Sequence, residues 1–282
     1  MNKDLFIKYI RWLFREFDAQ FRLALKGAKE VPVHDLRVMI KRLTALFLFL
    51  DEADIYRKRG TDFFKQLRDF FNSAGYLRDV QVMRSLIENY KNRIKDDISE
   101  YENYLAGKET SAKNSFFNSS EKYPEQIQSE IKNAIIASVR KFSDESLVQK
   151  SFLFMIKRLK RIDEYLQSSG TSRYLHKIRQ TLKQLRYFIE IFHASSDLAL
   201  IEESDFNEIK ELENIIGAWN DRSNLIEDIK YYKIYNQKLG ARSNWPGLIK
   251  LEQEIRKDRK EMVKDIRPRL LKFIYHLKYS IL

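Results

Sequence analysis

A motif of the form His-x-x-Arg-x-x-x-Lys occurs twice, and it constrains the fold more than any other feature of the sequence. The first copy begins at His34 and the second at His176, 142 residues later in a chain of 282. Residues of an α-helix advance about 100° each, so the His, Arg and Lys of a copy share one face. Leucine and isoleucine fall on the opposite face. Each copy therefore predicts an amphipathic helix, and the spacing predicts an internal repeat.

The charge of the polar faces is unusual for helix faces that are only solvent-exposed. A solvated face commonly mixes signs, because opposite charges four residues apart stabilise a helix and like charges destabilise it. Here both faces are almost wholly positive and start with histidine, which solubility alone explains poorly. We call these faces the cationic stripes. They comprise His34, Arg37 and Lys41 in the first copy, and His176, Arg179, Lys183 and Arg186 in the second.

The excess positive charge is shared evenly along the chain. The net charge is +12, and residues 1–141 and 142–282 each carry 26 Lys and Arg against 20 Asp and Glu. A basic tail is therefore not its source. The charge belongs to the folded repeat, and a field of this sign predicts a polyanionic partner.

Helix breakers are scarce, with eight glycines and four prolines, and no strand-like alternation is present. We predict an all-α fold of two four-helix bundles related by a pseudo-twofold axis, with a basic central groove. The bundles form one domain over residues 1–282, with repeat halves at about 1–106 and 144–282. A polar segment, about 107–143, joins the halves, and we interpret residues 107–126 as a mobile connection.

Caps and breakers predict where individual helices begin and end. The first helix is expected from Asn2 to Lys26, and Ser143 or Asp144 is expected to cap a helix at the start of the second half. We expect Gly75 and Gly217 to break helices at matching places in the two halves, and Gly107 to end another. The last helix is expected to open at Pro246 and to bend or break at Pro268.

Facing cationic stripes can line a groove for an anion with one charge per phosphate. Arginine binds phosphate through a planar fork and lysine through a point charge. Arg15 and Lys157, on flanking helices, would extend the lining, although solvated surface is at least as good an interpretation for them. Tyr187 lies within about 20° of the second stripe and would donate a hydrogen bond to phosphate.

Enzymatic signatures are missing from the sequence. It has no glycine-rich phosphate loop, no His-Glu-x-x-His and no serine or cysteine nucleophile motif. Glu190-x-x-His193 occurs once, whereas a di-iron bundle needs two such motifs. We therefore expect no catalytic residues, no metal and no cofactor. Asp79 and Asp221 each lie four residues after a glycine, and we interpret them as helix caps or as partners of a neighbouring arginine.

Nothing in the sequence predicts a membrane segment. The first residues lack the apolar block of a signal peptide, and the longest apolar run, Ala45 to Leu50, is too short to span a bilayer. Cysteine is absent, which is compatible with a reducing compartment. We expect a cytoplasmic protein.

The two motifs resemble the paired signatures of the CHAD family, the conserved-histidine α-helical domain. Residues 33–38 with Lys41 and Arg42 resemble the first signature, and residues 175–179 with Lys183 and Arg186-Tyr187 resemble the second. Residues 77–79 and 219–221 are similar to its Arg-Asp and Asn-Asp turns.

This resemblance covers essentially the whole chain. It implies two four-helix bundles around a basic central channel that binds inorganic polyphosphate. The first copy differs from the family pattern, since Thr44 stands where arginine is usual and where the second copy has Arg186. The first half is therefore expected to hold phosphate less firmly.

Our leading hypothesis is non-enzymatic binding of polyphosphate. A helical nucleic-acid-binding protein is the alternative, because both polyanions release counterions on binding. A phosphohydrolase is a third hypothesis, but it would need clustered carboxylates for a divalent metal, and the stripes contain few. The predicted polyphosphate-binding residues are His34, Arg37, Lys41, Arg42, His176, Arg179, Lys183, Arg186, Tyr187, Arg15 and Lys157.

Overall fold

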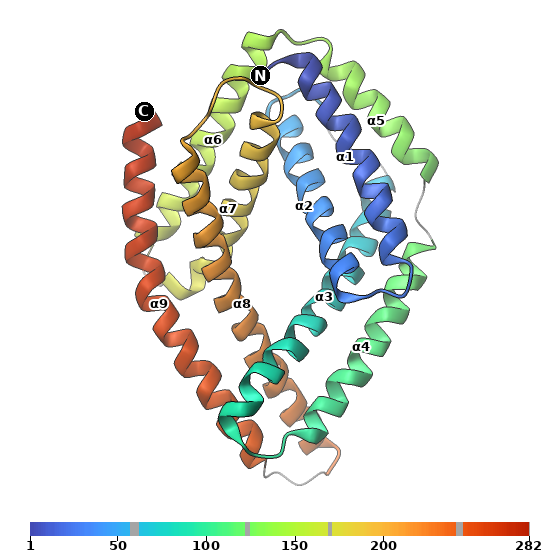
Figure 1. Ribbon diagram of the computed structural model, residues 1–282, viewed down its shortest axis with the longest axis vertical. Helices are drawn as coiled ribbons and strands as arrows, with labels where there is room; N and C mark the ends of the chain where they lie inside the picture. Colours follow the sequence, from blue (N-terminus) through green and yellow to red (C-terminus); the bar gives the residue numbers. More distant parts are fainter. Residues whose placement is uncertain (57–61, 122–124, 169–170, 241–244, 282) are drawn as a thin grey trace.

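A computed structural model describes residues 1–56, 62–121, 125–168, 171–240 and 245–281 of the chain. All regular structure in these ranges is helical, which confirms the predicted all-α class. None of the described helices combines the length and apolar character needed to cross a membrane. The helices are α1 (Lys3–Ala24), α2 (Glu30–Glu52), α3 (Asp62–Ile94), α4 (Ser99–Ser120), α5 (Glu125–Val139), α6 (Asp144–Gln167), α7 (Thr171–His193), α8 (Glu203–Lys238) and α9 (Pro246–Ile281) (Figure 1).

Helices of the two halves pack in the same order. In the first half α1 packs on α2, α2 on α3 and α3 on α4, and in the second half α6 to α9 repeat this series. The halves meet where α2 packs on α7 and α3 on α8, so these four helices surround the centre of the molecule (Figure 1). The stripe-bearing helices α2 and α7 therefore lie beside each other in the middle of the fold.

A single helix in the second half takes the place of two in the first. Helix α9 packs on both α8 and α6, whereas α4 packs on α3 and the separate helix α5 packs on α1. Pro268 lies 22 residues after Pro246, the first residue of α9, and Glu121, the C-cap of α4, lies 22 residues after Ser99, the first residue of α4. The helix continues through Pro268, although proline removes one backbone hydrogen bond there.

The predicted helix starts are confirmed at two caps. The Asn2 side chain accepts a hydrogen bond from the backbone N–H of Leu5 at 3.0 Å. Ser143 does the same for the N–H of Ser146 at 3.2 Å. Such caps satisfy backbone donors that have no partner within the helix. After α1 the chain turns at Gly27, whose φ of +108° favours glycine.

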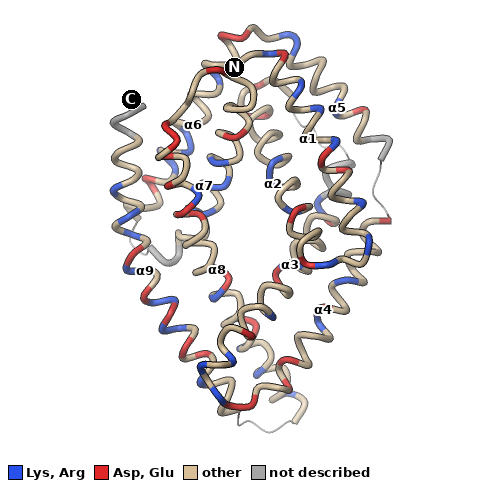
Figure 2. The backbone as a smooth tube through the Cα atoms, viewed as in Figure 1, with Lys and Arg blue, Asp and Glu red and all other residues tan. Residues whose placement is uncertain are grey.

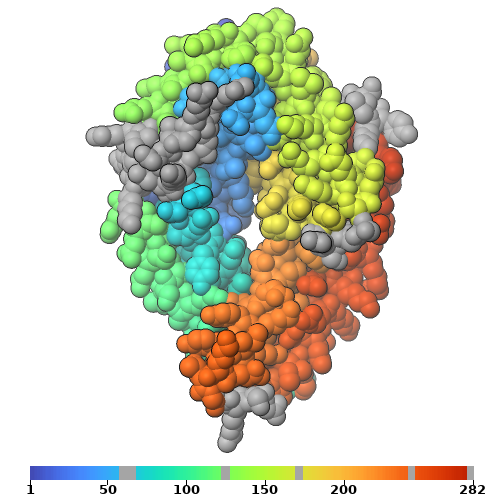
Figure 3. All heavy atoms as spheres, turned by 180° about the vertical axis from the view of Figure 1, so that it is seen from behind, coloured from blue at the N-terminus to red at the C-terminus, as the bar shows by residue number. Residues whose placement is uncertain are grey.

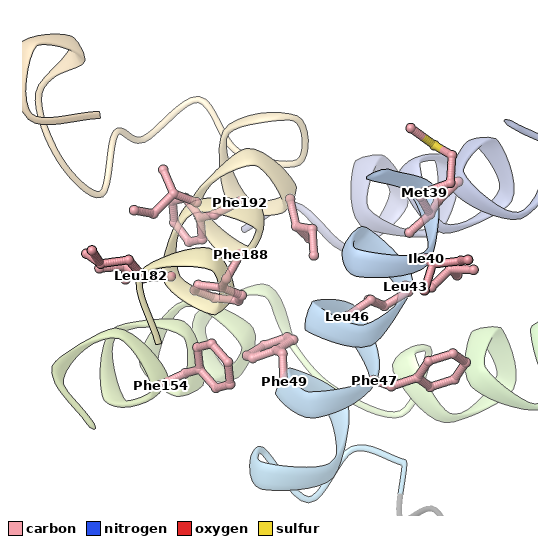
Figure 4. Close-up of a cluster of buried hydrophobic side chains, with 14 of the residues drawn as sticks. Met39, Ile40, Leu43, Leu46, Phe47, Phe49, Phe154, Leu182, Phe188 and Phe192 are labelled. Carbon is pink, nitrogen blue, oxygen red and sulfur yellow. The ribbon is translucent and has the colours of Figure 1, made fainter. Parts of the chain in front are cut away.

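The main hydrophobic core fixes α2 against α7. Phe49 of α2 lies 4.7 Å from Phe188 of α7 and 5.6 Å from Phe154 of α6, measured between ring centroids (Figure 4). The predicted apolar faces are buried here, including Leu36, Ile40 and Leu43 on α2 and Ile178, Leu182 and Leu185 on α7. Burial of these faces turns both cationic stripes away from the core. A second apolar cluster joins α3, α4, α8 and α9 at the other end of the molecule.

The predicted helix breaks at glycine are wrong. Gly75 lies inside α3, Gly217 inside α8 and Gly107 inside α4. The expected mobile connection is therefore helical as far as Ser120. The chain instead leaves the helix after α3, near Lys95, whose φ is +54°. A helix tolerates a single glycine at a cost of about 1 kcal/mol, which tertiary packing can offset.

We predict that Gly107→Ala raises the free energy of unfolding by about 0.5–1 kcal/mol, because alanine favours the helix interior. A Cβ at Gly107 would have no neighbouring atom within 4 Å, so no clash opposes the gain. Gly240→Ala is the matched control. Its Cβ also has open space, but its φ is +77°, so alanine there should destabilise by about 1 kcal/mol. Urea unfolding measures the free energy of unfolding of both variants. If residue 107 lay in a mobile connection, Gly107→Ala would not raise it.

Candidate anion-binding site

Four cations gather where the stripes of α2 and α7 face each other. Both helices run in the same direction, and Lys and Arg recur along each of them (Figures 1 and 2). The charges of Arg37 and Arg179 are close enough to affect each other, and so are those of Lys41 and Lys183. Seen from behind, the surface is hollowed between the α2 and α7 sides (Figure 3). The sequence motif therefore corresponds to one site with contributions from both halves.

The surroundings lower the pKa of both lysines, so each loses its proton at a lower pH than a lysine in solvent. Burial, followed by the charges of Arg37 and Arg179, lowers the pKa of Lys41 to about 8. Burial, followed by the charges of Lys41 and Arg179, lowers the pKa of Lys183 to about 7. The carboxylate of Glu213 opposes both shifts without cancelling them. The site is thus short of negative charge, and an anion placed there would favour the protonated lysines.

The two stripe arginines differ in their partners. Arg37 donates to the carbonyl oxygens of Ala74, at 3.5 Å, and Gly75, and its Nη1 lies 3.4 Å from the Asp79 carboxylate. Arg179, by contrast, has no hydrogen bond or ion pair within the described chain, and its Nε is buried without an acceptor. Buried donors are normally paired. Arg37 is therefore anchored to α3, while Arg179 remains available to an external acceptor.

The helical glycines let these arginines approach the neighbouring helices. A Cβ at Gly75 would lie 3.4 Å from Nη1 of Arg37, and a Cβ at Gly217 would lie 3.4 Å from Nε of Arg179. Both glycines are 142 residues apart, like the arginines that contact them. Their repetition thus reflects a repeated close approach of a guanidinium group to a helix.

The two motif histidines have different surroundings. His176 Nδ1 lies 3.0 Å from Asn220 Oδ1, and His176 Nε2 lies 2.9 Å from the Gln180 amide nitrogen. These contacts are satisfied when Nδ1 donates and Nε2 accepts, which is the neutral ring. In the first half Arg78 stands at the position of Asn220. Burial, and next the charge of Arg78, lowers the pKa of His34.

Arg42 and Arg186 are held by carboxylates. Arg42 Nε donates to Glu190 at 3.0 Å, and Arg186 donates to the same carboxylate at 2.7 Å and also to Glu213. Lys183 lies 3.8 Å from Glu213. This network ties α2, α7 and α8 together beside the site. It neutralises two of the cations that the sequence assigns to polyphosphate.

Tyr187 and the flanking cations lie outside the centre of the site. Tyr187 is only 2% exposed, and the Arg186 guanidinium stacks 4.0 Å from its ring centroid. Arg15 is exposed on α1 in a surface cavity of about 940 Å³ that also contains Lys8, Arg11 and Lys132. Lys157 pairs with Glu52 at 3.0 Å. The structure thus places Arg15 and Lys157 on α1 and α6, outside the paired stripes of α2 and α7.

Asp79 and Asp221 are not helix caps, because both lie in the middle of long helices, α3 and α8. The alternative prediction, that such an aspartate pairs with an arginine, is confirmed for Asp79. Burial raises the pKa of Asp79, against the opposing charge of Arg37. Asp221 contributes negative charge near both of these residues. In the part of the chain that the structure describes, no group of three His, Asp or Glu side chains could hold a metal ion.

The low pKa values of Lys41, about 8, and Lys183, about 7, predict that stability rises between about pH 7 and pH 10. Above its folded pKa each lysine binds fewer protons in the folded than in the unfolded protein, where the pKa is about 10.4. The free energy of unfolding then rises with pH, by up to about 1.4 kcal/mol per pH unit for each deprotonated lysine. Urea unfolding from pH 7 to 10 tests this, with Lys41→Met/Lys183→Met as the control that should lose the slope.

Comparisons with known proteins find similarity in sequence and in fold. The family model for the CHAD domain matches residues 8–230. No curated protein matches the sequence. The crystal structure of the CHAD domain from the plant Ricinus communis has a similar fold, with a TM-score of 0.66 over 95% of this chain and 91% of that chain. The two sequences are 13% identical, so this likeness concerns the fold alone.

Proposed function

The chain belongs to the CHAD family, and from this membership and the geometry of the stripes we propose that it binds inorganic polyphosphate without catalysing its reaction. Arg37, Lys41, Arg179 and Lys183 form the centre of the binding site, and His34 and His176 lie at its edge. The same proposal places the protein in the cytoplasm, in association with polyphosphate granules.

One observation carries this proposal: of the four cations facing each other between α2 and α7, only Arg37 and Lys183 pair with a carboxylate of the described residues. The buried Nε of Arg179 has no acceptor, and the pKa values of Lys41, about 8, and Lys183, about 7, are low. Phosphate oxygens at the Arg179 guanidinium group and at the two ammonium groups would supply the missing negative charge. Arg and Lys of one stripe are separated by one helical turn, about 6 Å. A linear anion with a charge on every phosphate suits such a row better than a single small anion.

Binding without chemistry is the simpler form of the proposal. The carboxylates beside the site already serve the protein's own cations, since Asp79 pairs with Arg37 and Glu213 with Arg186 and Lys183. Their positions support a role in holding the stripes in place.

Competition binding tests the proposal. Long polyphosphate, short polyphosphate, and single- and double-stranded DNA and RNA are compared at matched ionic strength and equal total charge. We expect long polyphosphate to displace the others, with a steep fall of affinity as salt rises, by analogy with DNA, whose binding also releases counterions. Equal or tighter binding of nucleic acid at physiological salt would favour the nucleic-acid alternative instead.

A variant with substitutions away from the site tests whether overall positive charge alone explains binding. Lys257 and Lys260 are exposed on α9, and replacing both by alanine removes two positive charges without touching the stripes. This variant should retain the preference for long polyphosphate. If it loses binding as severely as a stripe variant does, general charge, and not the site, holds the polymer.

A further inference from the structure

The C-terminal half of α8 exposes a row of apolar side chains. Their spacing of three, four and eight residues from the first places them along one side of the helix. Large apolar groups gathered on a surface often mark an interaction site. We call this row the α8 stripe, and its members with their exposed fractions are Tyr231 (60%), Ile234 (53%), Tyr235 (48%) and Leu239 (66%).

The internal repeat allows the α8 stripe to be compared with the corresponding positions of the first half. Positions 142 residues earlier, on and just beyond the end of α3, are also exposed but polar. The architecture of the two halves therefore does not require apolar side chains here. The corresponding residues are Asn89, Asn92, Arg93 and Asp97.

The α8 stripe borders a cavity of about 1120 Å³ between α3, α4 and α8. Tyr231 and Tyr235 belong to the α8 wall, with their rings stacked 6.2 Å apart, and Tyr76 on α3 is 45% exposed at the same cavity. On α4 the wall includes Gly107, whose missing side chain leaves open space. From behind, the orange segment of α8 lies next to the green α4 and the cyan α3 (Figure 3). The site is thus an open trough between helices.

The charge of the trough opposes that of the protein. Its lining contains Asp79, Glu227 and Asp228 but one cation, Lys108, in a chain of net charge +12. Asp79 also pairs with Arg37 and Glu227 with Lys230, two cations that lie outside the lining. Lys108 pairs with Asp228, and its ammonium group lies 5.8 and 5.5 Å from the ring centroids of Tyr76 and Tyr104. Aromatic rings and carboxylates here already surround one of the protein's own ammonium groups.

We propose that the α8 stripe and this trough dock an amphipathic helix of a partner protein, which places a Lys or Arg side chain in the trough among apolar residues. Helices commonly bind in such grooves through apolar anchors spaced along one face. The half-exposed tyrosines would pack on the apolar side chains of the partner helix. Glu227, whose side chain is 68% exposed and pairs with Lys230 at 2.8 Å, would exchange that partner for the basic group, because an exposed ion pair contributes little. This docking does not depend on polyphosphate binding.

A second copy of the chain is a poorer occupant. In a twofold contact the same patch faces itself, so the carboxylates of one trough would lie toward those of the other. Two chains that each carry a charge of +12 also repel each other at low salt. A basic segment of another protein avoids the repulsion between like-charged troughs.

Site-specific photo-crosslinking in the source cells tests the proposal. Tyr231 is replaced by p-benzoylphenylalanine in the full chain, and Asn89 is replaced in the same way as the matched control on α3. We expect position 231 to crosslink a different protein, through an amphipathic helix that contains Lys or Arg, and position 89 to give no such product. Glu227→Lys should lower the yield at position 231 about tenfold, with an unchanged melting temperature.

A synthetic peptide of the crosslinked helix then provides an equilibrium measurement. It should bind the parent protein and lose about tenfold in affinity when its basic residue is changed to glutamate, because that change sets like charges against each other. The proposal is overturned if position 231 crosslinks a second copy of the chain, a segment without a basic residue, or nothing beyond what position 89 gives.

Discussion

Replacing Arg179 and Lys183 together by alanine is expected to lower the affinity for long polyphosphate by at least about a hundredfold, with the melting temperature unchanged or higher. Two charge-assisted hydrogen bonds to phosphate are lost, each of which is commonly worth about 1.5–3 kcal/mol. The folded protein loses little, because Arg179 has no partner within the described chain and burial lowers the pKa of Lys183 to about 7. Removing these groups relieves repulsion with Arg37 and Lys41.

The first-half variant, Arg37→Ala with Lys41→Ala, distinguishes binding from anchoring. Arg37 holds carbonyl oxygens of α3 and the Asp79 carboxylate, so its loss should reduce both affinity and stability. Affinity is measured by titration with a labelled polymer and stability by thermal melting. If the second-half variant unfolds, or if it binds as tightly as the parent while folded, Arg179 and Lys183 are not the anion contacts.

The sequence sufficed to predict the fold class and the orientation of the stripe helices. Periodicity identifies an amphipathic helix because the apolar face must be buried, and Leu36 and Leu182 are indeed fully buried. Caps such as Ser143 act within three residues along the chain, so local sequence reveals them. Both kinds of prediction rest on interactions within one helix or on one face of it.

The role of a glycine was ambiguous in the sequence, because both a tight turn and the close approach of another group require the absence of a side chain. Gly75 and Gly217 repeat at the same spacing as the stripes, which is equally compatible with a turn and with a close approach. The approaching groups, Arg37 and Arg179, come from helices 38 residues away in the sequence. Only the packing of α2 on α3 and of α7 on α8 distinguishes the two cases.

The sequence likewise did not reveal which carboxylates pair with the cations of the stripes. Arg186 and Glu190 are four residues apart, a spacing at which an ion pair within one helix is expected. Glu213, however, comes from α8 and has no local signal. Because these two carboxylates hold Arg186, its presence where the first half has Thr44 does not by itself strengthen the second half of the site.

Glu213→Gln is expected to raise affinity for polyphosphate while lowering stability. The side chain is 8% exposed, donates nothing, and accepts hydrogen bonds from Arg186 beside Lys183. Glutamine keeps the volume but removes the charge, so Arg186 retains only Glu190 and Lys183 loses its nearest carboxylate. Breaking a buried ion pair costs about 3–5 kcal/mol. Because Glu190 still pairs with Arg186, we expect a loss at the low end of this range, about 3 kcal/mol.

The same substitution removes a negative charge that competes with phosphate for Lys183. Bound polymer should therefore restore more stability to the variant than to the parent, because a ligand that binds only the folded state stabilises it by mass action. Urea unfolding with and without polyphosphate measures this difference. Glu261→Gln is the control: its side chain is 60% exposed and pairs with an equally exposed Lys264, so neither quantity should change. If Glu213→Gln weakens binding while the protein stays folded, Glu213 positions the stripe for the anion, and its charge is not a competitor of phosphate.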